Sequence, residues 1–152
     1  MEYQTGSSDS KEMAEGRLIY TVSAIVRKAS DRALATWGLT VAQAPVLVIL
    51  REAGRPVMIT HVARRLLLET PSVTTMVDRL TERGLVERVK DPKDRRKTLV
   101  ALTRKGRRLV DTIREPGQQL EEEMFAALDQ NERASLKTIL KKFRDANIGR
   151  LD

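Results

Sequence analysis

Two short runs of β-forming residues flank a charged turn in the second half of this chain. The first run is LVERV at residues 85–89, the second is TLVAL at residues 98–102, and DPKDRRK at residues 91–97 lies between them. Such runs around a polar turn that contains proline are typical of a β-hairpin with a long tip. Since the rest of the chain has helical patterning, the sequence predicts a mainly α fold that carries one small β-hairpin wing.

The segment before the hairpin has the start and stop signals of two consecutive helices. A short helix is expected from a capping Thr60 to Leu67. A second helix is expected to begin at a capping Thr70, with Pro71 in its first turn, and to end before Gly84. The order of short helix, turn, helix and β-hairpin is that of a winged helix-turn-helix.

Long amphipathic helices are predicted at both ends of the chain. Apolar residues recur at helical spacing over residues 11–37, and another helical pattern follows the hairpin. Pro116-Gly117 predicts a kink or break in this later helix. Asp129 and Glu132 form a capping-box pattern, which begins a last helix to about residue 146.

The longest stretch without charge, residues 33–50, has the minimum length of a membrane span. It contains a capping-box pattern at Thr40 and Gln43, and Gly38 is typical of a helix C-terminus. Two helices that meet near Gly38, with a local irregularity at Pro45 in the second, explain the stretch better. We therefore expect no membrane span and a cytoplasmic protein.

The chain has 152 residues, which is the size of one domain, and we expect residues 11–152 to form it behind a disordered tail at residues 1–10. Cysteine is absent, which excludes disulfides, zinc fingers and thiol-based sensing. The single histidine, His61, gives no basis for a metal site. No glycine-rich phosphate loop or nucleophile–histidine pair is present, so we expect neither an enzyme nor a cofactor.

The positive charge of the chain is concentrated in its middle third. Residues 51–108 contain 16 basic and 7 acidic side chains, whereas the whole chain has 28 and 21 and a net charge of +7. This block therefore carries all of the excess charge. A basic block between balanced flanks indicates a surface that faces a polyanion, and nucleic acid is the first candidate, with a merely solvated face as the alternative.

The second helix of the pair and the tip of the hairpin carry the predicted contacts with double-stranded DNA. Small hydroxyl side chains near the start of a helix can reach base edges or phosphates in the major groove, and an arginine one turn later can reach phosphate or guanine. Basic side chains at the tip suit the adjacent minor groove. The predicted contact residues are Ser72, Thr74, Thr75 and Arg79 of the helix and Lys93, Asp94, Arg95, Arg96 and Lys97 of the tip.

A pattern of spaced residues at the tip is more specific than the charge. Asp94 and Arg96 are followed, after five residues, by Leu102-Thr103, and PSVTTMVDRLTERGLVERV precedes them at residues 71–89. In these features the chain resembles the MarR-type transcriptional regulators, over residues 17–143. It departs from their pattern at Leu67, where a turn glycine is common.

The resemblance implies a winged helix-turn-helix over about residues 55–103 and outer helices, about 11–36 and 104–146, that interlock two subunits into a homodimer. It also implies a sequence-specific repressor that a small aromatic or phenolic effector releases from DNA. The effector would bind in a crevice between the outer helices, which form the dimer, and the winged helix-turn-helix. Trp37 could line such a crevice, although a lone tryptophan at a helix junction is more often part of the core.

Two other classes of function remain open at this point. A winged-helix protein-interaction domain would share the fold without binding duplex DNA. An RNA-binding module would use exposed aromatic side chains to stack on bases, yet none of the chain's five aromatic residues lies within residues 51–108. Binding to duplex DNA separates both from the first interpretation.

Asp94 is unusual because an acidic side chain at the tip of a DNA-contacting hairpin faces phosphate. We hypothesise that Asp94 forms an ion pair that orients Arg96 toward the minor groove, so that less side-chain entropy is lost on binding. The alternative is that Asp94 only shapes the turn.

Overall fold

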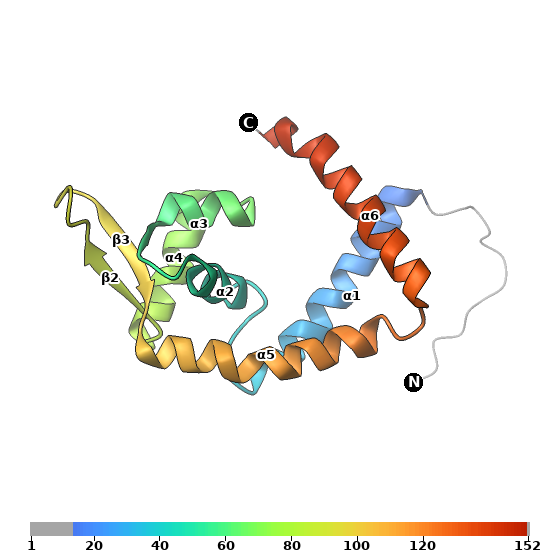
Figure 1. Ribbon diagram of the computed structural model, residues 1–152, viewed down its shortest axis with the longest axis horizontal. Coiled ribbons are helices and arrows are strands. Elements are labelled where there is room, and N and C mark those ends of the chain that lie inside the picture. Colours follow the sequence, from blue (N-terminus) through green and yellow to red (C-terminus); the bar gives the residue numbers. More distant parts are fainter. Residues whose placement is uncertain (1–13, 152) are drawn as a thin grey trace. The chain divides into compact units, whose positions relative to one another are not determined.

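The computed structural model describes residues 14–151, which form two compact units that meet in sequence between Ile113 and Arg114 (Figure 1). The tail expected at residues 1–10 lies outside the described residues. The first unit contains α1 (Glu15–Ala35), α2 (Ala44–Ala53), β1 (Val57–Met58), α3 (Ile59–Leu66), α4 (Thr70–Glu82), β2 (Val86–Lys90), β3 (Thr98–Leu102) and the start of α5 (Arg104–Met124). The second contains the end of α5, α6 (Gln130–Asn147) and a 3₁₀ turn (Ile148–Leu151).

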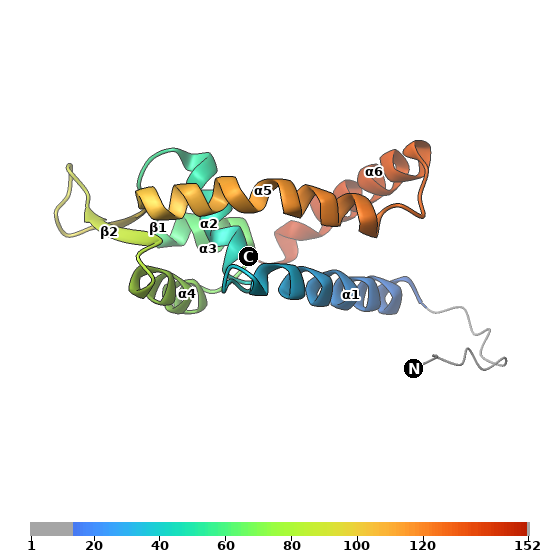
Figure 2. The same ribbon diagram turned by 90° about the horizontal axis from the view of Figure 1, so that it is seen from below.

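β3 is the central strand of a three-stranded antiparallel sheet with the order β1-β3-β2. The predicted hairpin is confirmed, with its first strand one residue later than expected, and Val86 pairs with Leu102 at its base. In Figures 1 and 2 its tip extends beyond the helices of the first unit. β1 was not predicted, because a strand of two residues shows no alternation of polar and apolar side chains.

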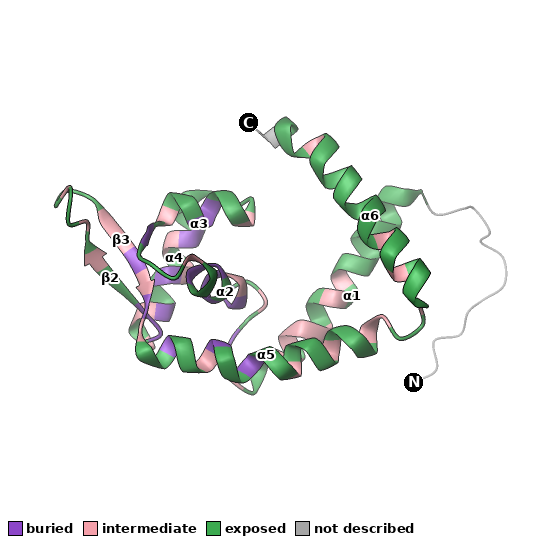
Figure 3. Cartoon of the chain, in the orientation of Figure 1, coloured by how far each residue is buried: buried purple, intermediate pink, exposed green. Residues whose placement is uncertain are grey.

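The core of the first unit lies between α2, α3, α4 and β3. Figure 3 shows buried positions on these elements and none along α1 or α6. Full burial of one such side chain is worth about 1.5–3 kcal/mol, so this cluster holds the helix pair and the sheet together. The fully buried side chains are Val46, Leu47, Val62, Val73, Val77, Leu80, Leu85, Val86 and Val100.

α2 begins later than the sequence indicated, and this removes the irregularity expected at Pro45. The N–H of Gln43 donates to Oγ1 of Thr40 at 3.2 Å, and the N–H of Thr40 donates to Oε1 of Gln43 at 3.3 Å. This reciprocal pair closes a turn ahead of the helix. Because α2 starts at Ala44, Pro45 lies in its first turn, where a backbone N–H has no helical partner.

The caps expected for α3 and α4 are misplaced. α3 starts at Ile59, so Thr60 lies inside it, and α4 starts at Thr70 after an extended Glu69; neither helix has a side-chain cap. Between them Leu67 adopts a left-handed backbone with φ 55, and the N–H of Leu68 donates to the carbonyl of Ala63 at 3.1 Å. The turn thus has the geometry for which glycine is the usual residue.

α5 continues through Pro116, so of the kink or break expected there the break is wrong. Proline removes one helical hydrogen bond, and the bonds before and after it keep the helix continuous. α5 ends at Met124, and the capping box that begins α6 is confirmed. The N–H of Asp129 donates to Oε2 of Glu132 at 2.9 Å, and the N–H of Glu132 donates to Oδ1 of Asp129 at 2.9 Å.

Candidate nucleic-acid interface

α4 buries one face in the core and leaves the opposite face open. Val73, Val77 and Leu80 are completely buried, and helix positions advance by about 100° per residue, which places the polar positions opposite them. Thr74 is half-buried at the edge of the polar face. The exposed side chains of this face include Ser72, Thr75, Asp78 and Arg79.

Thr74 and Thr75 of α4 direct their hydroxyl protons back to the helix. Oγ1 of Thr74 donates to the carbonyl of Thr70 at 2.9 Å, and Oγ1 of Thr75 donates to the carbonyl of Pro71 at 3.2 Å. The hydroxyl oxygens keep their lone pairs, so each side chain can still accept a hydrogen bond. The predicted polar face is therefore present, with acceptors rather than donors at its threonines.

An ion pair that the sequence analysis missed joins this face to the wing. Nη2 of Arg88, on β2, lies 2.6 Å from Oδ1 of Asp78, on α4. Both side chains are partly exposed, so the pair contributes about 1 kcal/mol at most. The ion pair matters for position, because it holds β2, the strand that leads to the tip, against α4. The register that brings the two residues together carries no signal in the sequence.

The tip of the hairpin is shaped by two aspartates. The N–H of Lys93 donates to Oδ1 of Asp91 at 2.8 Å, and the N–H of Arg96 donates to Oδ1 of Asp94 at 3.1 Å. The N–H of Lys97 donates to the carbonyl of Asp94 at 2.9 Å. Aspartate side chains that bond a backbone N–H two residues later are typical of tight polar turns. The tip is therefore an ordered loop.

Asp94 also contacts the side chain of Arg96. Nε of Arg96 lies 3.2 Å from Oδ1 of Asp94, and the Arg96 side chain is 93% exposed. The backbone N–H of Arg96 and, second, its guanidinium lower the pKa of the Asp94 carboxyl below its ordinary value. Both roles considered for Asp94, turn formation and pairing with Arg96, have a contact in the structure. The basic residues Lys93, Arg95, Arg96 and Lys97 are all exposed.

The base of the wing is locked to the start of α5. Oγ1 of Thr103 donates to the carbonyl of Gly84 at 2.7 Å and accepts the N–H of Gly106 at 3.0 Å. A Cβ at Gly106 would lie 2.0 Å from the carbonyl oxygen of Leu85. Only glycine allows this approach of α5 to the segment between α4 and β2.

Arg83, the residue that follows α4, donates hydrogen bonds to the turn between α1 and α2. Nη2 of Arg83 donates to the carbonyl of Trp37 at 2.8 Å, and Nη1 donates to the carbonyl of Gly38. Trp37 itself is half-buried and packs against the core cluster. The geometry is that of a core residue at a helix junction, and a role of Trp37 in effector binding stays a prediction.

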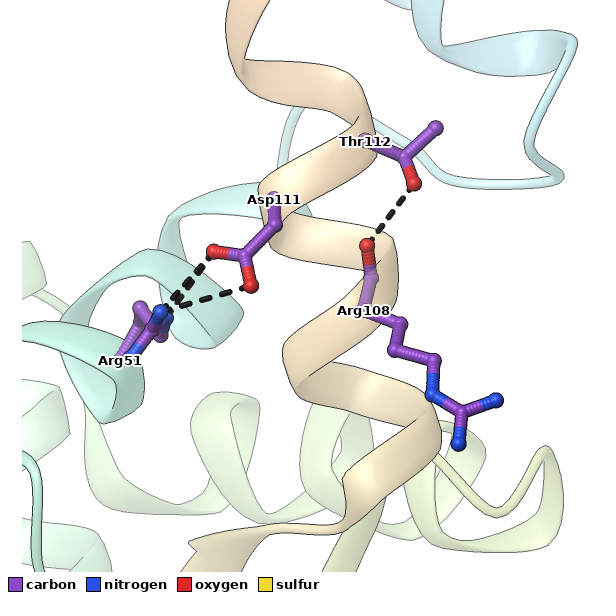
Figure 4. Close-up of polar contacts among 4 residues, drawn as sticks. All are labelled: Arg51, Arg108, Asp111 and Thr112. Carbon is purple, nitrogen blue, oxygen red and sulfur yellow. Dashed lines mark hydrogen bonds and ion pairs between the residues drawn. The ribbon is translucent and has the colours of Figure 1, made fainter.

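A second contact fixes α2 to the start of α5. Nε and Nη2 of Arg51 donate to Oδ1 of Asp111 at 3.2 and 3.0 Å (Figure 4). Arg108 and Thr112 lie on other faces of the same helix, where the hydroxyl of Thr112 donates to the carbonyl of Arg108 at 2.9 Å. The contact between Arg51 and Asp111, together with the apolar core, therefore fixes which face of α5 lies against α2.

Large apolar side chains are exposed on α1 and, separately, on α6. They include Leu18, Ile19, Val22 and Ile25 on α1, and Ile139, Leu140 and Phe143 on α6. Exposed apolar rows of this size are typical of interaction surfaces. Among residues 14–151, no helix combines the length and apolarity that a membrane crossing needs, and no group of three or more potential ligand side chains could hold a metal ion.

Known proteins resemble this chain in sequence and in fold. A family model described as the MarR family matches residues 37–97. The chain is 35% identical over 130 residues to the multiple antibiotic resistance protein MarR of Salmonella typhimurium, covering 84% of this chain and 88% of that protein. A crystal structure of a mutant MarR from E. coli complexed with operator DNA has a TM-score of 0.79 and 32% identity, covering 84% of this chain and 91% of that one. The structure of Bordetella bronchiseptica BpsR, from work on how 6-hydroxynicotinic acid regulates its DNA binding, has a TM-score of 0.81 and 29% identity, covering 92% and 99%.

Proposed function

Because this chain belongs to the MarR family, we propose that it is a sequence-specific, DNA-binding transcriptional repressor that a small-molecule effector releases from its operator. The observation that carries the proposal is the exposed polar face of α4 next to a hairpin whose tip bears four exposed basic side chains. The ion pair between Asp78 and Arg88 joins these two parts into one surface. A helix and a basic hairpin placed in this way suit two neighbouring grooves of one duplex.

Within this proposal the two parts have different tasks. α4 enters the major groove, where Thr75 and Arg79 face the bases and Ser72, nearer the helix start, faces phosphate. The tip lies at the minor groove, where Arg96 is inserted and the other basic residues contact phosphates. The half-buried Thr74 lies at the edge of the same face.

The repressor acts as a homodimer in this proposal. The apolar rows on α1 and α6 leave several side chains half or more exposed, among them Ile25 at 60% and Ile139 at 64%. A second copy would cover such rows, which are costly to leave in water. Light scattering at micromolar concentration tests this: the proposal requires a dimer, and a stable monomer would contradict it.

A relative supports the proposed class of effector. A small aromatic or phenolic acid is the proposed ligand, as 6-hydroxynicotinic acid is in the work on BpsR. A fluorescence binding screen of aromatic acids, with displacement from DNA as the second readout, tests this part separately. An effector that binds without changing the affinity for DNA would contradict the release step.

The salt dependence of binding to a duplex tests the DNA-binding surface. Each phosphate neutralised by a basic side chain contributes about −0.9 to the slope of log affinity against log salt. With about four to six contacts per dimer, the slope is about −4 to −5. Lys97→Ala at the tip should reduce its magnitude, whereas Arg27→Ala, an exposed residue of α1, should not. A slope near zero would mean that residues 51–108 do not face DNA.

A further inference from the structure

Thr75 occupies the middle of the exposed face of α4. It lies opposite the buried side chains of this helix, with Ser72 and Arg79 on one side of it and Asp78 on the other. The side chain in the middle of a helix face is the one that stands deepest in a groove that the helix enters. The chemistry that Thr75 presents therefore decides what the centre of this face can recognise.

The single proton of the Thr75 hydroxyl is engaged inside the helix, 3.2 Å from the carbonyl oxygen of Pro71. A hydroxyl has one proton to donate and lone pairs to accept with. In this state Thr75 presents an acceptor oxygen and a methyl group, but no donor. The same bond to the residue four positions earlier is made by Thr74 and, at 2.8 Å, by Thr81, so all three threonines beyond the first residue of α4 share this state.

We propose that Thr75 selects a thymine–adenine base pair at the position that α4 reaches with its centre, an inference that rests on the proposed function. In the major groove this pair presents the thymine 5-methyl group, which an apolar methyl contacts, and the adenine N6 amino group, which an acceptor oxygen receives. Guanine presents two acceptors there, and these find no donor in Thr75. Cytosine has an amino group but lacks the methyl.

The neighbours of Thr75 sharpen this choice. Arg79, one turn later, offers the paired donors that suit guanine, so the two positions select different bases. Asp78 would favour cytosine as an acceptor, but its ion pair with Arg88, 2.6 Å between Oδ1 and Nη2, holds its carboxylate at the side of the face and not at its centre. The central preference of α4 is therefore left to Thr75.

The experiment begins with selection of bound sequences from a random duplex pool, using the full-length protein. Each thymine of the selected half-site is then replaced singly by deoxyuridine, which removes only the 5-methyl group, and affinity is measured by fluorescence anisotropy. At one position the replacement should weaken binding about fourfold, the effect of one buried methyl group. That difference should disappear in Thr75→Ser, which lacks the partner methyl, and persist in Thr75→Val, which retains it.

Thr81→Ser is the matched control, because it removes the same methyl group from a half-buried threonine of the same helix. The thymine–deoxyuridine difference should remain in this variant. If every deoxyuridine effect persists in Thr75→Ser, or if the half-site holds only guanine–cytosine pairs, the assignment to Thr75 is wrong. If no duplex is enriched at all, the proposed function fails, and the inference with it.

Discussion

The carboxylate of Asp94 accepts two hydrogen bonds from Arg96, one from its backbone N–H at 3.1 Å and one from its Nε at 3.2 Å. One oxygen, Oδ1, receives both. The turn and the direction of the guanidinium stem are therefore set by the same atom. This arrangement explains how an acidic side chain can be useful at the tip of a hairpin that faces phosphate.

A double-mutant cycle separates the two roles of Asp94 in DNA binding. Arg96→Ala should weaken binding by about 1–3 kcal/mol, the usual range for a base or groove contact. Asp94→Ala should also weaken it, although a negative charge is removed, and should add little once Arg96 is alanine. Asp94→Asn keeps an acceptor for the backbone N–H and loses the charge, so its effect isolates the ion pair. Tighter binding by Asp94→Ala would show that charge repulsion dominates.

The titration of Asp94 should show the same two contacts. Because its pKa is lowered from 3.8, the contacts contribute stability to the tip above that pH and lose it as pH falls through the lowered value. Carboxyl ¹³C NMR should therefore give a midpoint below 3.8. In Arg96→Ala the midpoint should rise only in part, since the backbone N–H, the larger cause, remains. A full return to 3.8 would assign the effect to the side chain alone.

Gly106 and Gly117, both in α5, should respond to alanine in opposite ways. A Cβ at Gly106 meets the carbonyl of Leu85 at 2.0 Å, whereas nothing lies within 4 Å of one at Gly117. Gly106→Ala should lower the free energy of unfolding by about 3 kcal/mol, at the upper end of overpacking effects. Gly117→Ala should raise it by up to about 1 kcal/mol, because alanine favours the helix. Urea denaturation measures both, and equal effects would contradict the close approach at Gly106.

Arg83, just after α4, should contribute more to the free energy of unfolding than Arg79, which lies on the exposed face of α4. Arg83→Met retains the apolar stem but leaves the carbonyls of Trp37 and Gly38 without this donor, which should cost about 1–3 kcal/mol in unfolding free energy. Arg79→Met, on the exposed face, is the control and should change stability by less than about 0.5 kcal/mol. Similar losses in both variants would mean that the carbonyl contacts contribute nothing.

The elements that could be predicted are those whose signals are local. The hairpin, the helix pair and the capping box at Asp129 depend on residues within a few positions of one another, and all are present. The errors arose where a local signal has two outcomes. Thr40 and Gln43 form their reciprocal bonds around a turn instead of a helix start, and Pro116 is accommodated within a continuous helix.

The parts of the interface that could not be predicted depend on contacts between distant segments. Arg88 meets Asp78 only because β2 packs against α4, and Arg83 meets Trp37, which lies 46 positions earlier in the chain. No spacing along the chain encodes either contact. The contact between Asp94 and Arg96 was within reach of the sequence, because the two residues are only two positions apart. The DNA-contact residues themselves stay predictions.

The contacts of Arg83 also bear on how an effector could regulate DNA binding. Its guanidinium joins the end of the helix proposed to read DNA to the turn that follows α1, so we expect displacement of that turn and displacement of α4 to be energetically coupled. Such coupling is reciprocal. If a ligand shifts the turn and lowers the affinity for DNA by some factor, bound DNA lowers the affinity for that ligand by the same factor. Operator occupancy would then set how much effector a cell must accumulate before the gene responds.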